Sequence, residues 1–179
     1  MNSSSNVSSP SLTPVRLRDL EPADRAPLER ILRATGSFYA HEVDVALELI
    51  DDRLARRQSG SERPDDYRFL VAHDGSGNGV AGYVCFGLSP LTDGVFDLYW
   101  IAVDPRLQRS GVGRALLGAV EGEVKRLGGR MLLVETGGKP SYAPTRAFYE
   151  RAGYGEIARI PDFFQVGDDK VVYARRFDL

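Results

Sequence analysis

The chain has 179 residues, 42% of them hydrophobic, and a formal net charge of -2. This length and composition predict one globular domain with an ordinary core. The nearly balanced charge gives no general attraction to nucleic acid or to an anionic membrane, and no apolar run is long enough for a membrane span, so we expect neither partner. The single cysteine, Cys85, excludes an intramolecular disulfide, and with only two histidines the composition argues against a metal site.

The N-terminal segment 1–13 is rich in Ser and Asn and lacks the apolar centre of a secretory signal. We therefore expect a disordered tail at 1–13, a folded domain over 14–179 and a cytoplasmic protein.

Hydrophobic periodicity and turn residues predict alternating strands and helices along the domain. In chain order, the expected elements are a strand at 15–18, helices at 21–36 and 41–57, strands at 67–73, 80–88 and 95–103, a helix at 112–127, a strand at 130–135, a helix at 145–151 and strands at 154–160 and 170–177. The glycine-rich connection 74–79 predicts a hairpin, so three antiparallel strands should follow in series. The helix at 112–127 forms a crossover, which implies a parallel pair and an α/β fold with a mixed sheet.

An anion-binding turn is predicted where the strand ending at Val103 leads into this helix. The run is Gln108-Arg109-Ser110-Gly111-Val112-Gly113-Arg114. Its two glycines have no side chain to hold a diphosphate away, so successive backbone N–H groups at the helix start can point at it. Such a site needs neither a lysine nor a metal.

Two blocks of residues resemble one family. Val103-Asp104-Pro105 followed by Gln108-x-x-Gly111-x-Gly113 resembles the acyl-CoA signature of the Gcn5-related N-acetyltransferases, the GNAT family, and 147–154 resembles that family's second conserved block. The resemblance runs from about residue 15 to the C-terminus in the order of the elements. It implies a mixed sheet whose parallel strands splay apart, and direct transfer of the acetyl group of acetyl-CoA to a primary amine of a small molecule or peptide.

The resemblance also implies where the co-substrate binds. The pantetheine arm would take backbone hydrogen bonds from Ile101 and Val103, and the diphosphate would lie on the N–H groups of the turn. The implied cofactor-binding residues are Ile101, Ala102, Val103, Gln108, Arg109, Ser110, Gly111, Val112, Gly113, Arg114, Tyr142 and Tyr149. The chain departs from the family at Tyr142, where relatives often carry asparagine.

Acyl transfer requires a neutral amine, and Asp97 falls where many relatives carry a glutamate assigned as the base. Period-two alternation predicts that Asp97, Tyr99, Ile101 and Val103 share one face of their strand. Aspartate is one methylene shorter than glutamate, so we expect it to act through a water molecule. The alternative is an ordinary solvated charge near a strand end.

Tyr149 aligns with the tyrosine that many relatives place beside the CoA sulfur as the general acid. Its alternative role is a core aromatic on a short helix. The backbone N–H of Ile101 is the expected oxyanion donor if its strand bends away from the neighbouring strand.

The family's fold places the acceptor between its first two helices and its last hairpin, here 35–42 and 161–170. The candidate apolar residues are Phe38, Tyr39, Phe163 and Phe164, and the candidate cation-attracting residues are Glu42, Asp162, Asp168 and Asp169. Each has an alternative role in the core or in a turn. A homodimer is compatible with the expected exposed strands.

Two other functions remain open from the sequence. One is a non-catalytic module that senses acetyl-CoA, which the presence of both Asp97 and Tyr149 disfavours. The other is a dinucleotide-binding oxidoreductase, because Gly111-x-Gly113 precedes a helix, although Leu116 replaces the third glycine of that motif.

Overall fold

The computed structural model describes residues 15–74 and 79–178. The predicted tail at 1–13 and most of the predicted hairpin connection 74–79 lie outside the described residues. Within the described ranges, no helix combines the length and the apolar character needed to cross a membrane.

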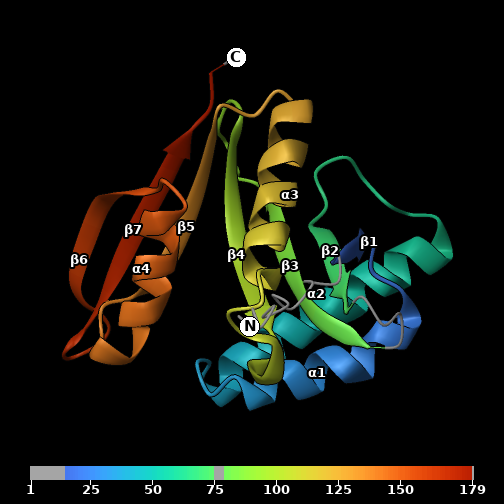
Figure 1. Ribbon diagram of the computed structural model, residues 1–179. Helices are drawn as coiled ribbons and strands as arrows, with labels where there is room; N and C mark the ends of the chain where they lie inside the picture. The colour runs from blue at the N-terminus through green and yellow to red at the C-terminus, as the bar shows by residue number, and fades with distance from the viewer. Residues whose placement is uncertain (1–14, 75–78, 179) are drawn as a thin grey trace, which may run out of the picture.

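The expected α/β fold with a mixed sheet is confirmed (Figure 1). The strands are β1 (Arg16–Arg18), β2 (Arg68–His73), β3 (Val80–Leu88), β4 (Val95–Val103), β5 (Met131–Gly137), β6 (Gly155–Gln165) and β7 (Asp168–Arg176). The helices are α1 (Arg25–Ala34), α2 (Ala40–Ser59), α3 (Val112–Arg126) and α4 (Ala143–Arg151), with short 3-10 turns at Pro22–Asp24, Pro105–Leu107 and Pro140–Tyr142. The seven strands form one sheet in the order β1-β2-β3-β4-β5-β7-β6.

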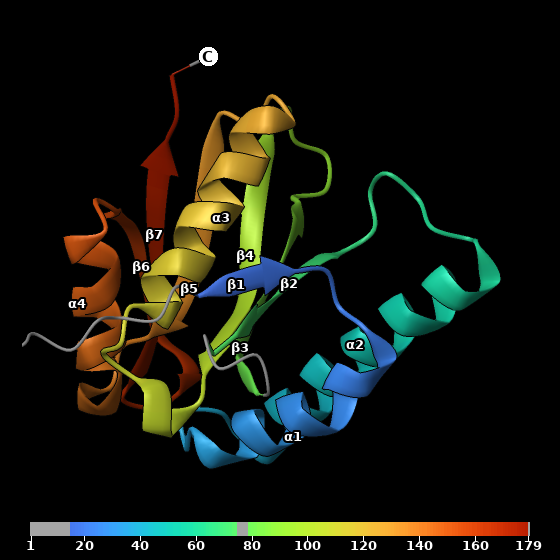
Figure 2. The same cartoon turned by 45° about the vertical axis from the view of Figure 1, so that its right-hand side comes forward.

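Helices cover both faces of this sheet (Figure 2). The helices α1 and α2 bury one apolar stripe each against one face, through Leu28, Ile31, Leu32, Val43, Leu47 and Ile50. The helices α3 and α4 cover the other face, and α3 buries Val112, Leu116, Leu117, Val120 and Val124, which recur at helical spacing. The sheet therefore separates two cores, and β4 contributes side chains to both.

The parallel pair β4 and β5 is joined along only part of its length. The register pairs Val95–Leu98 with Met131–Val134. Beyond these residues β4 stays paired with β3 as far as Val103, and β5 stays paired with β7 as far as Gly137. The two strands therefore splay apart, as the resemblance implied, and Figure 1 shows them separating toward the end of the sheet farther from the C-terminus.

A bulge in β4 corrects one prediction. Tyr99 has no partner in the register of β3, which shifts the alternation of the strand by one residue. As a result Ile101 and Val103 pack against the core on the α3 side, whereas Tyr99 and Trp100 pack against the core on the α1–α2 side. The prediction that Asp97, Tyr99, Ile101 and Val103 share one face is therefore wrong, because strict period-two alternation holds only for a strand without an extra residue.

Candidate active site

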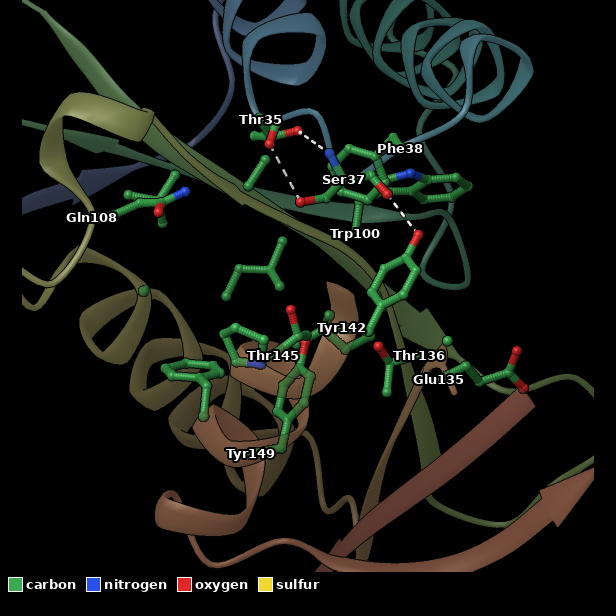
Figure 3. Close-up of a pocket in the computed structure, with 18 of the residues that line it drawn as sticks. Thr35, Ser37, Phe38, Trp100, Gln108, Glu135, Thr136, Tyr142, Thr145 and Tyr149 are labelled. Carbon is green, nitrogen blue, oxygen red and sulfur yellow. Dashed lines mark hydrogen bonds between the residues drawn. The ribbon is translucent and has the colours of Figure 1, made fainter. Parts of the chain in front are cut away.

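A cavity of about 800 Å³ occupies the space between the splayed ends of β4 and β5 (Figure 3). The predicted cofactor residues that line it are Ile101, Ala102, Val103, Gln108, Arg109, Gly111, Gly113, Arg114, Tyr142 and Tyr149. Ser110 and Val112 are not among the lining residues: the Ser110 hydroxyl donates to the Leu107 carbonyl at 2.5 Å, and the Val112 side chain is buried in the core. The cavity thus brings together predicted cofactor residues that are up to 48 positions apart in the chain, from Ile101 to Tyr149.

One wall of the cavity is the free edge of β4. Past Leu98, no strand of the described residues pairs with the side of β4 that faces β5. Backbone groups on this edge, from Tyr99 to Val103, therefore have no strand partner on that side and can hydrogen-bond to a ligand. The prediction that the Ile101 N–H donates to an oxyanion requires β4 to separate from its neighbour at this residue, and here it does so from β5.

Asp104 fixes the turn that follows β4. Its carboxylate accepts hydrogen bonds from the Arg106 backbone N at 2.9 Å and from the Arg106 Nε and Nη2 atoms at 3.0 and 2.7 Å. The hydrogen bonds to the guanidinium lower the pKa of Asp104, although burial opposes them. Asp104 is 5% exposed, so this charged cap holds the start of the turn from inside the protein.

The turn itself presents unpaired amides. Arg109 and Gly111 both have positive φ, 64° and 92°, before the right-handed helix α3 begins. Within the described residues, the backbone N–H groups of Gly111, Val112, Gly113 and Arg114 donate to no other group. Amides at a helix start that follow left-handed residues form a concave site for an anion. The N–H of Ser110 differs, because it donates to the Leu107 carbonyl at 3.4 Å.

Tyr149 reaches this cavity from α4 (Figure 3). It is 2% exposed and lies among the rings of Phe148, Tyr154 and Tyr173. Burial raises the pKa of its phenol, so the hydroxyl keeps its proton at neutral pH. No hydrogen bond joins this hydroxyl to another group in the described chain, and a buried hydroxyl that faces a cavity is free to donate to a ligand.

Asp97 lies in the joined part of β4, opposite Leu133 of β5 and Gly87 of β3, and is not a lining residue of the cavity. Leu98 and Tyr99, the two residues that follow it, do line the cavity. The pKa of the Tyr99 phenol is raised by burial first and then by the negative charge of Asp97. The two side chains therefore lie close enough to influence one another.

Tyr142 bridges the two sides of the cavity. Its ring packs on Gly137, where an added Cβ atom would lie 2.6 Å from Cδ2 of that ring. Its hydroxyl donates to the Ser37 carbonyl at 2.6 Å, a contact between the α4 side and the α1–α2 loop (Figure 3). The Lys139 ammonium donates to the Tyr39 hydroxyl across the same gap.

The predicted acceptor residues divide into two groups. Phe38, Tyr39, Glu42, Phe164 and Asp168 line the cavity. Phe163, Asp162 and Asp169 do not, and Asp162 instead accepts the Gly167 N–H at 2.6 Å in the turn of the last hairpin. Asp168 is buried and accepts the Gly138 and Lys139 N–H groups at 3.1 and 3.3 Å, so it anchors the loop before α4.

Several lining residues were not predicted, among them Trp100, Glu135, Thr136 and Phe148. Glu135 and Thr136 lie on β5 immediately past its last pairing with β4. Because a splayed pair was expected, Glu135 and Thr136 could have been predicted as lining residues from their position at the end of the second parallel strand. Trp100 could not be found in this way, because the bulge decides its face.

The comparisons with known proteins agree with this fold. A family model described as an acetyltransferase (GNAT) domain matches residues 65–156. A solved structure from Desulfovibrio desulfuricans, assigned to the GNAT family of acetyltransferases, is 43% identical, with a TM-score of 0.82 and coverage of 91% of this chain and 99% of that one. The comparison with curated proteins gave no match.

Two more distant structures share the fold and were solved with acetyl-CoA or coenzyme A. The Salmonella typhimurium protein yncA, with its cofactor acetyl-CoA, is 20% identical over 92% of this chain and 94% of its own, with a TM-score of 0.66. An aminoglycoside 6'-N-acetyltransferase complexed with coenzyme A is 16% identical over 90% of this chain and 96% of its own, with a TM-score of 0.67.

A dinucleotide-binding oxidoreductase would require a sheet of mainly parallel strands. In the described residues β1 to β4 pair antiparallel, and the one parallel pair is β4 with β5. That alternative is therefore excluded by the topology. The fold, the family model and the 43% identical structure together show that the chain belongs to the GNAT family of acetyltransferases and is an acyltransferase.

Proposed function

We propose that this enzyme transfers the acetyl group of acetyl-CoA to a primary amine of a small molecule or peptide, in a complex that holds both substrates at once. The observation that carries this proposal is that the unpaired amides before α3, the free edge of β4 and the Tyr149 hydroxyl all border one cavity. Acetyl-CoA would supply the reactive thioester. The predicted cytoplasmic location and homodimer remain predictions.

The fit to acetyl-CoA rests on the shape of the turn. Gly111 is in the left-handed region, and among the described residues beyond its two chain neighbours no atom lies within 4 Å of where its Cβ would be. The unpaired N–H groups from Gly111 to Arg114 would hold the diphosphate. Arg109 and Arg114 would add positive charge, and Gln108 and Val112 would border the same segment. Ser110 would shape the turn through its bond to Leu107.

The pantetheine arm would lie along the free edge of β4, where Ile101 and Val103 offer backbone hydrogen bonds in place of a strand, with Ala102 between them. When the amine attacks the thioester carbonyl, a C–N bond forms and negative charge develops on the carbonyl oxygen. The Ile101 N–H would stabilise that charge, because a preorganised donor away from bulk water is worth more than one in water. The ring of Tyr142 would border the thioester end of the arm.

The reaction must also move two protons. The C–S bond breaks as the C–N bond forms, and the leaving sulfur would take a proton from the Tyr149 hydroxyl, which burial keeps protonated. The amine must lose a proton before or during attack, and Asp97 would accept it through a water molecule or through the Tyr99 hydroxyl. A relay suits the position of Asp97, because its side chain does not line the cavity.

The test measures CoA release and acetylated product over a panel of amines, together with acetyl-CoA binding. In the same assay, Tyr149→Phe should lower kcat by about 10²-fold while the dissociation constant for acetyl-CoA changes by less than about threefold. An unchanged kcat would remove Tyr149 from the mechanism. Tight acetyl-CoA binding without any acetylated product would instead support the sensing module.

A further inference from the structure

The end of the cavity away from the anion-binding turn is lined by aromatic side chains. Phe38, Trp100, Tyr142 and Phe164 all line the cavity. Figure 3 shows Phe38, Trp100 and Tyr142 gathered there, on the side opposite Gln108. We call this the acceptor end. Such a surface favours a flat or apolar skeleton, because aromatic rings bury a large area and stack with defined geometry.

Glu42 supplies a negative charge at the acceptor end. Its carboxylate accepts the backbone N–H of Tyr39 at 2.7 Å, which caps α2. Among the described residues Glu42 forms no ion pair, and its side chain is half-buried in the cavity wall. A half-buried carboxylate without a counter-ion attracts a cationic ligand.

The lysines near this end are already paired. Lys139 lies 3.3 Å from the Asp168 carboxylate, and Lys170 lies 2.6 Å from that of Glu135. Both carboxylates belong to residues that line the cavity. The two pairs are therefore close to neutral overall, and the charge of Glu42 remains.

The arginines do not change this balance. Arg146 donates to the backbone carbonyls of Gly137 and Lys139, at 2.8 and 3.0 Å, and is not a lining residue. The arginines that do line the cavity, Arg109, Arg114 and Arg151, come from the turn before α3, from α3 and from the end of α4.

The pKa of Tyr142 also indicates a negative electrostatic potential at the acceptor end. The pKa of the Tyr142 phenol is raised by burial, then by the carboxylates of Glu42 and Asp168, and Lys139 lowers it less. At the acceptor end, a carboxylate on the acceptor would thus meet negative charge without an unpaired lysine among the described residues, which would cost affinity.

We propose that the acceptor is a primary amine on an aromatic or apolar skeleton without a carboxylate next to the amine, and that Glu42 binds the ammonium group as it enters. This inference rests on the proposed function and narrows its substrate class. It distinguishes arylalkylamines from the amino acids that share their skeletons.

The test uses matched pairs that differ by one carboxylate, tryptamine against tryptophan and tyramine against tyrosine. We expect kcat/KM for each amine to exceed that for its amino acid by at least about 100-fold. Glu42→Gln keeps an oxygen that can accept the Tyr39 N–H but removes the negative charge. The KM for tryptamine should therefore rise about 10-fold, while kcat and the KM for acetyl-CoA stay within about twofold of their original values. Glu48→Gln, an exposed carboxylate on the same helix, is the matched control and should change none of these values.

Three results would overturn the inference and leave acetyl transfer standing: equal use of amine and amino acid, identical behaviour of the Glu42 and Glu48 variants, or acetylation of some other amine class with neither pair used. Failure to bind acetyl-CoA, or binding with no amine acetylated, would instead refute the proposed function, so the two failures are distinguishable.

Discussion

The anion-binding turn can be tested with two substitutions at Gly113. A Cβ atom at this position would lie 3.6 Å from Val103 Cγ2 and 3.7 Å from the Phe148 ring, both ordinary contacts with residues that line the cavity. The free protein should therefore accept a side chain here without strain. Gly113→Ala should not lower the melting temperature, since alanine favours a helix by up to about 1 kcal/mol over glycine.

Gly113→Glu should affect CoA strongly. Two like charges about 5 Å apart repel by about 3 kcal/mol at an effective dielectric constant of about 20, which corresponds to a loss of affinity of about 100-fold. Gly113→Ala adds only a methyl group to the space for the diphosphate and should cost about 10-fold or less. Calorimetric titration with CoA measures both, and the loss in Gly113→Glu should shrink at high salt because ions screen the repulsion.

The matched control is Gly118→Glu, which places the same charge farther along α3 at an exposed position with no atom within 4 Å of the new Cβ. It should bind CoA almost as the unmodified protein does. If Gly113→Glu and Gly118→Glu bound CoA equally well, the diphosphate would not lie at this turn, and the assignment of the unpaired amides would be wrong.

Two further predictions concern the residues around the cavity. Tyr142→Phe removes the hydrogen bond to Ser37, so it should lower stability by about 1 kcal/mol and raise the acceptor KM a few-fold, with CoA affinity unchanged. Tyr142→Ala should weaken CoA binding as well. An unchanged acceptor KM in both variants would place Tyr142 outside the acceptor site. Asp104→Asn should destabilise the protein by about 1 kcal/mol at neutral pH, a value discounted because the Arg106 side chain is 80% exposed. Because the pKa of Asp104 is lowered in the folded state, its contribution is present above the unfolded value of about 3.9 and is lost as pH falls through the folded pKa. The difference in melting temperature between the two proteins should therefore begin to shrink below about pH 4, and a constant difference down to pH 2 would contradict the role of the charge.

The sequence contains strong signals for the elements and for one half of the site. In α3, Val112, Leu116, Val120 and Val124 recur at helical spacing and are all buried, so the periodicity identified the helix and its inner face. The glycine pattern before α3 marked the anion-binding turn, because backbone exposed at a helix start needs residues without side chains.

The acceptor half of the site was harder to predict from the sequence. The bulge at Tyr99 carries no sequence marker, since Tyr99 and Trp100 are both suited to a strand and the extra residue is defined only by pairing with β3. The contact between Tyr142 and Ser37 joins residues 105 positions apart, and no local pattern encodes such a meeting. Contacts of this kind depend on how the loops pack after the sheet has formed.

The extra residue in β4 also limits how this enzyme can be recombined with its relatives. The alternation of side chains between the two faces shifts by one residue at Tyr99. This shift depends on the number of residues in β4 more than on their chemical nature. A chimaera joined within β4 with one residue fewer would turn Ile101 and Val103 toward α1 and α2 and remove the edge proposed for the pantetheine arm. Crossover points for engineering new acceptors are therefore safest outside 98–101, in the loops that carry the acceptor end.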